Sequence, residues 1–287
     1  MERYIDEYIA HIHKQKKYKP NTAEAYARDL RQFAAFLAQE GIDAAQPARV
    51  TKTAVMAYAM HVQREGKSAA TVIRMLSAIR TFFGYLIANG HLRSNPAAEV
   101  DAPKPMRAVV PNVLTTAQID ALIAQTAGDA PLAVRDCAML EVLYGSALHV
   151  SELVALECTD VDLERRVVRA GARVMPLSKA AVVALQRYLA VRSALAGGEQ
   201  TTALFLKRNG QMMTRQGCWK MIRARAVKAG IQETVTPRQL RGSLAAHLVA
   251  NGVDASAVQT MLGMSAAIPG YADVRGIDVL RRAHPRG

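Results

Sequence analysis

The stretch TPRQLRGSLAAHL, residues 236–248, has the pattern of a helix with charged residues near its start. Thr236 is a favourable N-cap residue, and Pro237 suits the first helical position. Three leucines then recur at helical spacing and predict a buried stripe: Leu240, Leu244 and Leu248. Arg238 and Arg241 stand beside this stripe. Two guanidinium groups so close to the start of a buried helix predict a functional role for this stretch.

The composition narrows the class of protein. The chain has 287 residues, a net charge of +13 and a pI near 9.9. This length suits one large or two ordinary domains. The large positive net charge favours a polyanionic partner, and nucleic acid is a better candidate than a membrane. Residues 1–112 carry 16 Lys and Arg against 10 Asp and Glu, and the rest of the chain carries 21 against 14. Both parts are therefore expected to face the same polyanion.

The sequence also predicts a location. No apolar run approaches the roughly 18 residues that span a membrane, and residues 1–17 lack the uniform apolar core of a signal peptide. The three cysteines have no spacing typical of a metal site: Cys137, Cys158 and Cys218. Reduced thiols in a cytoplasmic protein, with no metal and no membrane partner, are the expectation.

Proline residues divide the chain. Residues 101–112 contain three prolines, which interrupt helices and predict an extended linker. Residues 1–100 are expected to form a helical domain, and residues 113–287 a second domain that is mainly helical with a small β hairpin. The predicted fold is thus mainly α and has two domains.

Four helices are predicted in the first domain: around residues 4–12, from Pro20 to Gly41, over residues 51–64, and from Ser68 to about Gly90. The last of these has an apolar stripe: Val72, Leu76, Ile79, Phe83 and Leu86. Thr71 and Arg74 lie off the stripe. They fit either a solvated face or a face that enters a DNA groove and contacts phosphates and bases.

The second domain mixes helices with short strands. Helices are predicted over residues 133–144 and from Ser151 onward, a hairpin over 161–177 with Gly171 near its turn, and a strand over 203–206. Residues 207–228 then contain seven cations and no acid: Lys207, Arg208, Arg215, Lys220, Arg223, Arg225 and Lys228. Thr214 is expected to cap a helix in this run, with three residues facing inward: Trp219, Ile222 and Ala226. Since surface helices usually interleave acids with bases, this run favours a nucleic-acid contact over a merely solvated face.

Five segments, in this order and at suitable spacing, resemble the Xer-type tyrosine recombinases: KSAATVIRMLSAIRTFFGYLIANG (67–90), YGSALHVSELVALECTDVD (144–162), MTRQGCWKMIRARAVKAGI (213–231), TPRQLRGSLAAHLVANGVD (236–254) and LRRAHPRG (280–287). The resemblance implies an N-terminal core-binding domain and a catalytic domain that together clamp double-stranded DNA. It also implies that strands are cut and rejoined through a 3′-phosphotyrosyl link, without a metal or nucleotide cofactor, in a tetrameric synapse.

The same resemblance identifies the expected catalytic positions. Arg241 and Tyr271 match the family in type. His149 stands where the family has an arginine, in the box Ala147-Leu148-His149-Val150-Ser151-Glu152, and Arg238 stands where it has a histidine. A developing negative charge on the phosphate would be held by guanidinium groups, and the tyrosine would have to lose its proton.

Other positions depart from the family pattern. Gly242 replaces a second histidine, and Met264 stands where a proton donor belongs. Tyr271 follows Met264 by seven residues instead of the usual nine. The hairpin is about five residues shorter than in the family and contains no lysine, so that Arg173 is its nearest cation.

These departures gather at the chemical site, while the helical stripes and the basic run are intact. We therefore predict a DNA-binding protein that is deficient in strand cleavage, with a set of expected DNA contacts: Thr71, Arg74, Lys207, Arg215, Lys220, Arg223 and Arg241. One alternative is an active recombinase with an unusual pocket. Another is a non-catalytic subunit that joins copies of itself or an active relative through the tail, residues 280–286.

Overall fold

The computed structural model of the chain describes residues 1–15, 18, 20–43, 45–103, 113–198, 200–263 and 282–286. The chain divides into two compact units, Met1–Val109 (unit 1) and Val110–Gly287 (unit 2). Most of the predicted linker, residues 104–112, lies outside the described residues.

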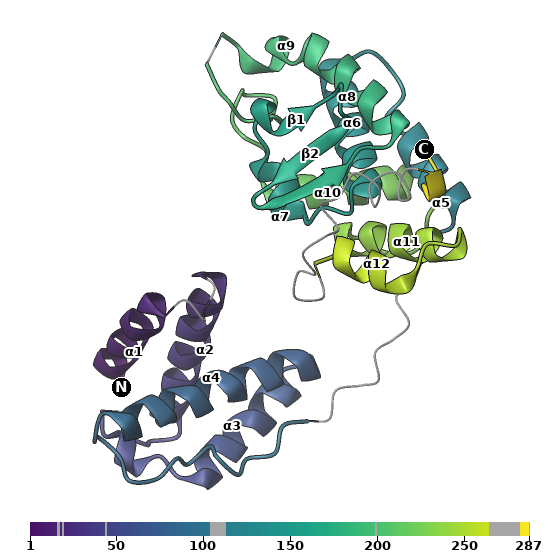
Figure 1. Ribbon diagram of the computed structural model, residues 1–287. Helices are drawn as coiled ribbons and strands as arrows, with labels where there is room; N and C mark the ends of the chain where they lie inside the picture. Colours follow the sequence, from purple (N-terminus) through teal and green to yellow (C-terminus); the bar gives the residue numbers. More distant parts are fainter. Residues whose placement is uncertain are drawn as a thin grey trace. The chain divides into compact units, whose positions relative to one another are not determined.

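Unit 1 is helical, as predicted (Figure 1). Its elements are α1 (Glu2–Lys14), α2 (Pro20–Gln39), the 3-10 helix η1 (Pro47–Arg49), α3 (Lys52–Arg64) and α4 (Ala69–Ala88). The hydroxyl of Ser68 caps α4 by accepting the backbone N–H of Thr71 at 3.2 Å. The predicted stripe of α4 is buried: Val72, Leu76, Ile79, Phe83 and Leu86.

Helix α4 is the core helix of unit 1. It packs against α1, α2 and α3, and aromatic side chains from these helices surround it: Tyr8, Phe33 and Tyr58. By length and composition alone, α4 would be able to cross a membrane. Its buried apolar face and its two arginines, Arg74 and Arg80, fit the core helix of a folded domain better. The guanidinium of Arg80 donates to the backbone carbonyls of Ala97 and Val100.

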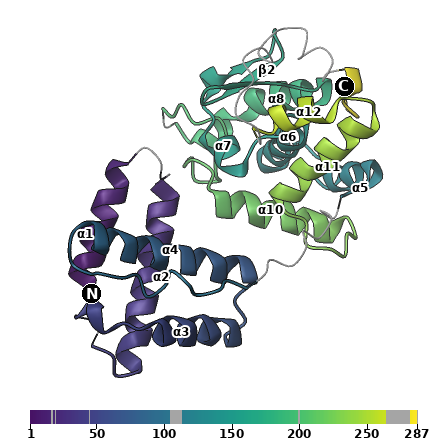
Figure 2. The ribbon, with the colours of Figure 1, turned by 60° about the horizontal axis from the view of Figure 1, so that its bottom comes forward.

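Unit 2 combines helices with a small sheet (Figures 1 and 2). Its helices are α5 (Thr116–Ala124), α6 (Pro131–Gly145), α7 (Val150–Ala155), η2 (Cys158–Asp160), α8 (Lys179–Val191), α9 (Ser193–Ala196), α10 (Arg215–Lys228), α11 (Pro237–Ala250) and α12 (Ala255–Met261). Helix α6 is buried along most of its length and packs against α5, α7, α8, α9 and α11.

The predicted hairpin forms the sheet. Strands β1 (Val161–Asp162), β2 (Val167–Ala170) and β3 (Arg173–Pro176) pair antiparallel in the order β1-β2-β3. Gly171 has φ +61° at the β2–β3 turn, a conformation that glycine adopts without strain. The register pairs Ala170 with Arg173, so Arg173 is the first residue after the turn.

The predicted strand over residues 203–206 is wrong. This segment makes only isolated bridges, Glu157 with Ala203 and Leu206 with Met212. The carbonyl of Leu204 accepts hydrogen bonds from the Tyr188 hydroxyl at 3.0 Å and from Arg192 Nε at 3.1 Å. Because side chains satisfy this backbone group, the buried apolar segment needs no neighbouring strand.

Glycines 84 and 90 give a stability prediction for unit 1. Gly84 lies exposed within α4 with no neighbour that a Cβ would meet, so Gly84→Ala should raise the free energy of unfolding by about 0.5–1 kcal/mol. Gly90 follows the same helix at φ +76°, so Gly90→Ala should lower it by about 1 kcal/mol. Urea unfolding followed by far-UV circular dichroism measures both changes. The fluorescence of Trp219, the only tryptophan, reports unit 2 and should not move. Equal shifts for the two variants would contradict the prediction.

Candidate catalytic pocket and basic surface

Helix α11 positions Arg241. The Thr236 hydroxyl caps the helix by accepting the backbone N–H of Gln239 at 3.1 Å, and the leucine stripe is buried as predicted: Leu240, Leu244 and Leu248. Arg241 lies at the edge of this stripe and is only 8% exposed, whereas Arg238 is exposed at the start of the helix. The two arginines of the helix start therefore have different environments, one inside the fold and one at its surface.

The guanidinium of Arg241 joins three elements. Its Nη1 lies 2.6 Å from Nδ1 of His149 and also contacts Nε2 of the same ring. Its Nη2 donates to the carbonyl of Leu262, just after α12. Because a guanidinium only donates hydrogen bonds, the imidazole nitrogen that faces it must accept. Burial lowers the pKa of Arg241, and the nearby charge of Arg173 lowers it further, while Glu152 raises it.

His149 begins α7. Its backbone N–H donates to Oε2 of Glu152 at 2.7 Å, a contact that fixes the first turn of this helix. Ala147, two residues earlier, has φ +50°. Ala147 thus adopts a left-handed conformation that favours glycine two residues before the N-cap of α7.

Arg173 lies near Arg241, although the sequence did not predict it as a site residue. From the start of β3, its Nη2 lies 2.5 Å from each carboxylate oxygen of Glu152, and its Nη1 donates to the carbonyl of Met261 at 3.1 Å. The one signal in the sequence was that Arg173 is the cation nearest the missing lysine in the shortened hairpin. The structure thus brings Arg173, Glu152, His149 and Arg241 together at the end of α12.

This cluster has an excess of positive charge. Two guanidinium groups lie inside it, the charge of Arg238 also reaches Arg241, and Glu152 contributes a single carboxylate. Guanidinium pairs of this kind hold oxyanions such as phosphate. Two positions singled out in the sequence, Met264 and Tyr271, lie outside the described residues.

The basic run forms α10, capped as predicted by Thr214, whose hydroxyl accepts the backbone N–H of Gly217 at 3.0 Å. Its buried face consists of Cys218, Met221, Ile222 and Ala226. The prediction that Trp219 faces inward is only partly right: Trp219 is half-buried, because the stripe follows positions 218, 222 and 226 and the next residue is turned about 100° away. The guanidinium of Arg223 lies 5.4 Å from the centre of the Trp219 ring.

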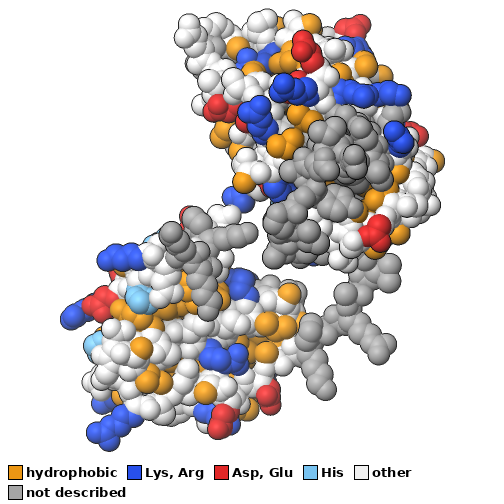
Figure 3. Space-filling model, in the orientation of Figure 1, with side chains coloured by type: hydrophobic (Ala, Val, Ile, Leu, Met, Phe, Trp, Pro, Cys, Tyr) orange, Lys and Arg blue, Asp and Glu red, His pale blue; other side chains and the backbone are white. Residues whose placement is uncertain are grey.

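The cations of the run have different roles. Arg215, Lys220 and Arg223 are exposed, while Lys207 donates to Oε1 of Gln211 at 2.9 Å. Arg225 instead faces the interior: it donates to Oδ2 of Asp136 on α6 at 2.8 Å and to the carbonyl of Gln125 at 2.5 Å. The charge of Arg225, which faces inward, is therefore neutralised by an acid from another helix. Figure 3 shows Lys and Arg side chains spread over the visible surface of both units.

The two candidate DNA contacts of unit 1 lie on α4. Arg74 is ion-paired with Asp29, a carboxylate that is 6% exposed, and the Arg74 side chain remains 41% exposed. Burial raises the pKa of Asp29, and the pairing with Arg74 opposes this shift. Thr71 shares a hydrogen bond of 2.9 Å with the hydroxyl of Ser68. Arg74 therefore holds a buried acid and still presents part of its surface to solvent.

Comparison with known proteins identifies the family. Residues 112–267 match the phage integrase family, and residues 5–90 match the SAM-like N-terminal domain of phage integrases. The tyrosine recombinase XerD of Listeria monocytogenes is 32% identical over 299 residues, covering all of both chains. The tyrosine recombinase XerC of Roseiflexus castenholzii is 36% identical over 272 residues, covering 92% of this chain and 85% of that protein. The chain belongs to the Xer-type tyrosine recombinases.

The solved structures agree with the family fold. The Tn1549 transposon integrase, determined in complex with transposon right end DNA, covers 92% of this recombinase and 91% of its own chain, with a TM-score of 0.72 and 21% sequence identity. The predicted fold class, mainly helical with a small hairpin sheet in a two-domain tyrosine recombinase architecture, is confirmed.

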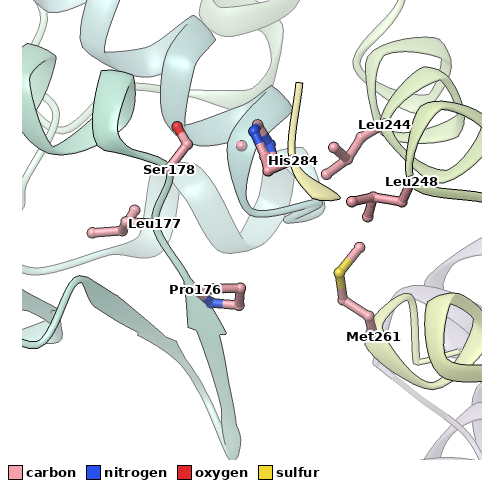
Figure 4. A pocket seen from close by; sticks show the side chains of 8 residues that line it. Pro176, Leu177, Ser178, Leu244, Leu248, Met261 and His284 are labelled. Atoms are coloured by element: carbon pink, nitrogen blue, oxygen red, sulfur yellow. The ribbon is translucent and has the colours of Figure 1, made fainter. Parts of the chain in front are cut away.

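The described tail of this recombinase, residues 282–286, packs on its own unit. Figure 4 shows the ring of His284 between Ser178 on one side and Leu244 and Leu248 on the other. Two nitrogens of Arg286 contact the buried carboxylate of Glu141 at 2.6 and 2.9 Å. The predicted docking of the tail on a neighbouring subunit stays a prediction.

Two further histidine contacts stabilise this region. The hydroxyl of Tyr144 lies 2.7 Å from Nδ1 of His247, so His247 is part of the packing between α6 and α11. Burial lowers the pKa of His247, raises that of Tyr144 to about 12, and lowers that of His284 to about 4. The Nε2 atom of His284 is buried and has no hydrogen-bond partner among the described residues, and Arg286 adds a nearby positive charge.

The tail histidine makes stability depend on pH. An unfolded histidine titrates near pH 6.5, so as pH falls the unfolded chain binds a proton at position 284 before the folded chain does. The contribution of His284 to the free energy of unfolding is present above pH 6.5 and is lost toward pH 4. Between pH 7 and 5 the loss should be about 2 kcal/mol. Urea unfolding of unit 2 at both pH values, followed by Trp219 fluorescence, measures it.

His284→Gln should lose this part of the pH dependence, whereas His13→Gln, a change at an exposed histidine of α1, should keep it. If the parent and His284→Gln lose the same amount between pH 7 and 5, His284 is not the group responsible.

Proposed function

We propose that this Xer-type recombinase binds duplex DNA and that its strand-cleavage activity is strongly impaired. The observation that carries the proposal is the position of His149. Its imidazole stands where the family has an arginine, and it accepts from the guanidinium of Arg241 instead of presenting a second permanent charge to a phosphate.

DNA binding is supported by charge and by the surface of α10. The chain has a net charge of +13, and Arg215, Lys220 and Arg223 extend from an anchored helix into solvent. Phosphate contacts from such side chains supply most of the affinity of a protein for DNA. The Tn1549 integrase, which shares the fold, was solved in complex with DNA.

Impaired cleavage is supported by the chemistry that the reaction needs. A tyrosine attacking a phosphodiester must lose its proton, the departing oxygen must gain one, and the negative charge between them must be held. Position 149 carries an imidazole, position 242 has no side chain, and position 264 has a thioether. Removing one preorganised donor typically costs about 10²–10³ in rate, and losses in one cooperating site combine without adding linearly.

A second candidate function is site-specific recombination with an altered pocket. It is supported by the two guanidinium groups of Arg173 and Arg241 in the pocket and by similarity to XerD along the whole chain. Tyr271, the residue at the nucleophile position of the family, is present. The two candidates differ in one measurable product, a covalent link between Tyr271 and DNA.

The DNA-binding proposal predicts a loss of affinity on α10. Arg215→Ala with Lys220→Ala should weaken binding to a duplex selected from a random-sequence pool. The slope of log affinity against log salt should flatten by about one for each phosphate that the variant no longer neutralises. Fluorescence anisotropy over a series of salt concentrations measures both quantities. The control is Lys179→Ala with Arg187→Ala, which removes the same charge from the exposed face of α8. Equal effects of the two double variants would place the interface elsewhere.

The cleavage proposal predicts that the parent forms no 3′-phosphotyrosyl adduct on nicked duplexes of the selected sequence, as resolved on denaturing gels. Tyr271→Phe should then bind DNA as the parent does, while Arg241→Ala should bind less well because its guanidinium no longer holds a phosphate. An adduct in the parent that Tyr271→Phe abolishes would overturn impaired cleavage and establish the second candidate.

A further inference from the structure

Arg173 and Arg241 approach the same short piece of backbone from different elements. Arg173 comes from β3 and donates to the carbonyl of Met261, while Arg241 comes from α11 and donates to the carbonyl of Leu262. These are consecutive residues at the C-terminal end of α12, where unpaired helix carbonyls carry partial negative charge. The two guanidinium groups therefore donate to two neighbouring backbone carbonyls at the same helix end.

The orientation of Arg173 is set by Glu152. Both carboxylate oxygens lie 2.5 Å from Nη2 of Arg173, and the side chains of Arg173 and Glu152 are 27% and 24% exposed, so the pair is open to solvent on one side. A guanidinium carries five N–H groups, and these contacts engage only its terminal nitrogens, Nη1 and Nη2. Arg173 can thus hold a further acceptor while Glu152 keeps it in place.

The box position cannot supply this second guanidinium. At residue 149 the chain has an imidazole, which is engaged with Arg241, while the acid of the same box, Glu152, is engaged with Arg173. The acid at the start of α7 thus orients an arginine from the hairpin. The positive charge that an arginine at position 149 would carry is supplied instead by Arg173 of β3, whose charge acts on Arg241 of α11.

We infer that Arg173 is the second phosphate-holding guanidinium of this pocket, paired with Arg241 and oriented by Glu152. The inference rests on the proposed DNA binding. A DNA phosphate is a full anion and accepts charge-assisted hydrogen bonds more strongly than a neutral carbonyl. Bound phosphate would therefore compete with the carbonyls of Met261 and Leu262 for the same donors.

A phosphate-holding role for Arg173 and a purely structural role predict opposite effects of Glu152→Gln on the affinity for DNA. If Arg173 holds phosphate, the negative charge of Glu152 competes with that phosphate, and Glu152→Gln should tighten DNA binding, because the amide oxygen can still accept from Arg173 and orient it while the competing charge is gone. The neutral amide still offers an oxygen to the backbone N–H of His149 at the start of α7. If the ion pair only ties the hairpin to α7, Glu152→Gln should loosen the pocket and weaken binding.

The test measures the affinity of the full chain for the selected duplex over a salt series, with Trp219 fluorescence during urea unfolding as the check on folding. Arg173→Gln should bind about ten-fold more weakly, with a salt slope lower by about one. Arg173→Lys should keep the slope, and Glu152→Gln should bind more tightly than the parent. Arg169→Gln, an exposed cation on the neighbouring strand β2, is the matched control and should change little.

The inference is overturned if Arg173→Gln behaves like Arg169→Gln, or if Glu152→Gln weakens binding. Should Arg173→Gln fail to fold, the Arg173→Lys and Glu152→Gln results still decide the question. Failure of the inference is distinguishable from failure of the proposed function. In the first case the parent binds DNA and responds to replacement of Arg215 and Lys220, and in the second the parent does not bind at all.

Discussion

The buried guanidinium of Arg241 is the group on which the pocket depends. It links α11 to His149, the N-cap residue of α7, and to the backbone that follows α12, so three elements meet on one side chain. A buried arginine costs free energy unless its donors are occupied, and here an imidazole nitrogen and a backbone carbonyl accept from it. Burial also lowers the pKa of Arg241, and the nearby positive charge of Arg173 lowers it further. A phosphate at this position would relieve the excess of positive charge.

Helix α10, which carries the basic run, also has an inward-facing charge that is paired. Arg225 is fixed to Asp136, a carboxylate of the central helix α6 that also pairs with Arg135. This network ties one side of α10 to helix α6, while Arg215 and Lys220 are exposed to solvent. A run of bases without acids is thereby compatible with a stable helix, because its compensating acid comes from a distant part of the chain. The arrangement supports the proposal that α10 contacts DNA.

Much of the fold could be predicted from the sequence. The helices of unit 1, the capped helices at Thr214 and Thr236, and the hairpin turn at Gly171 follow from local signals, namely periodic apolar residues, cap residues and a glycine at positive φ. The segment 203–206 was misjudged as a strand because an apolar run shows burial without showing its partner. The carbonyl of Leu204 accepts from the side chains of Tyr188 and Arg192. The carbonyl of Leu206 accepts from Arg135, and no local pattern reveals either arrangement.

The site divides in the same way. The sequence by itself determined that Arg241 lies near the start of a buried helix, that position 149 has a histidine in place of the family's arginine and that the shortened hairpin has no lysine. Only the tertiary structure decided that Arg173 and Glu152 form a pair beside Arg241 and that Arg225 faces inward. The reason is physical: helical and strand periodicity are set by neighbours within a few residues, whereas an ion pair joins side chains that the chain path brings together from positions tens of residues apart.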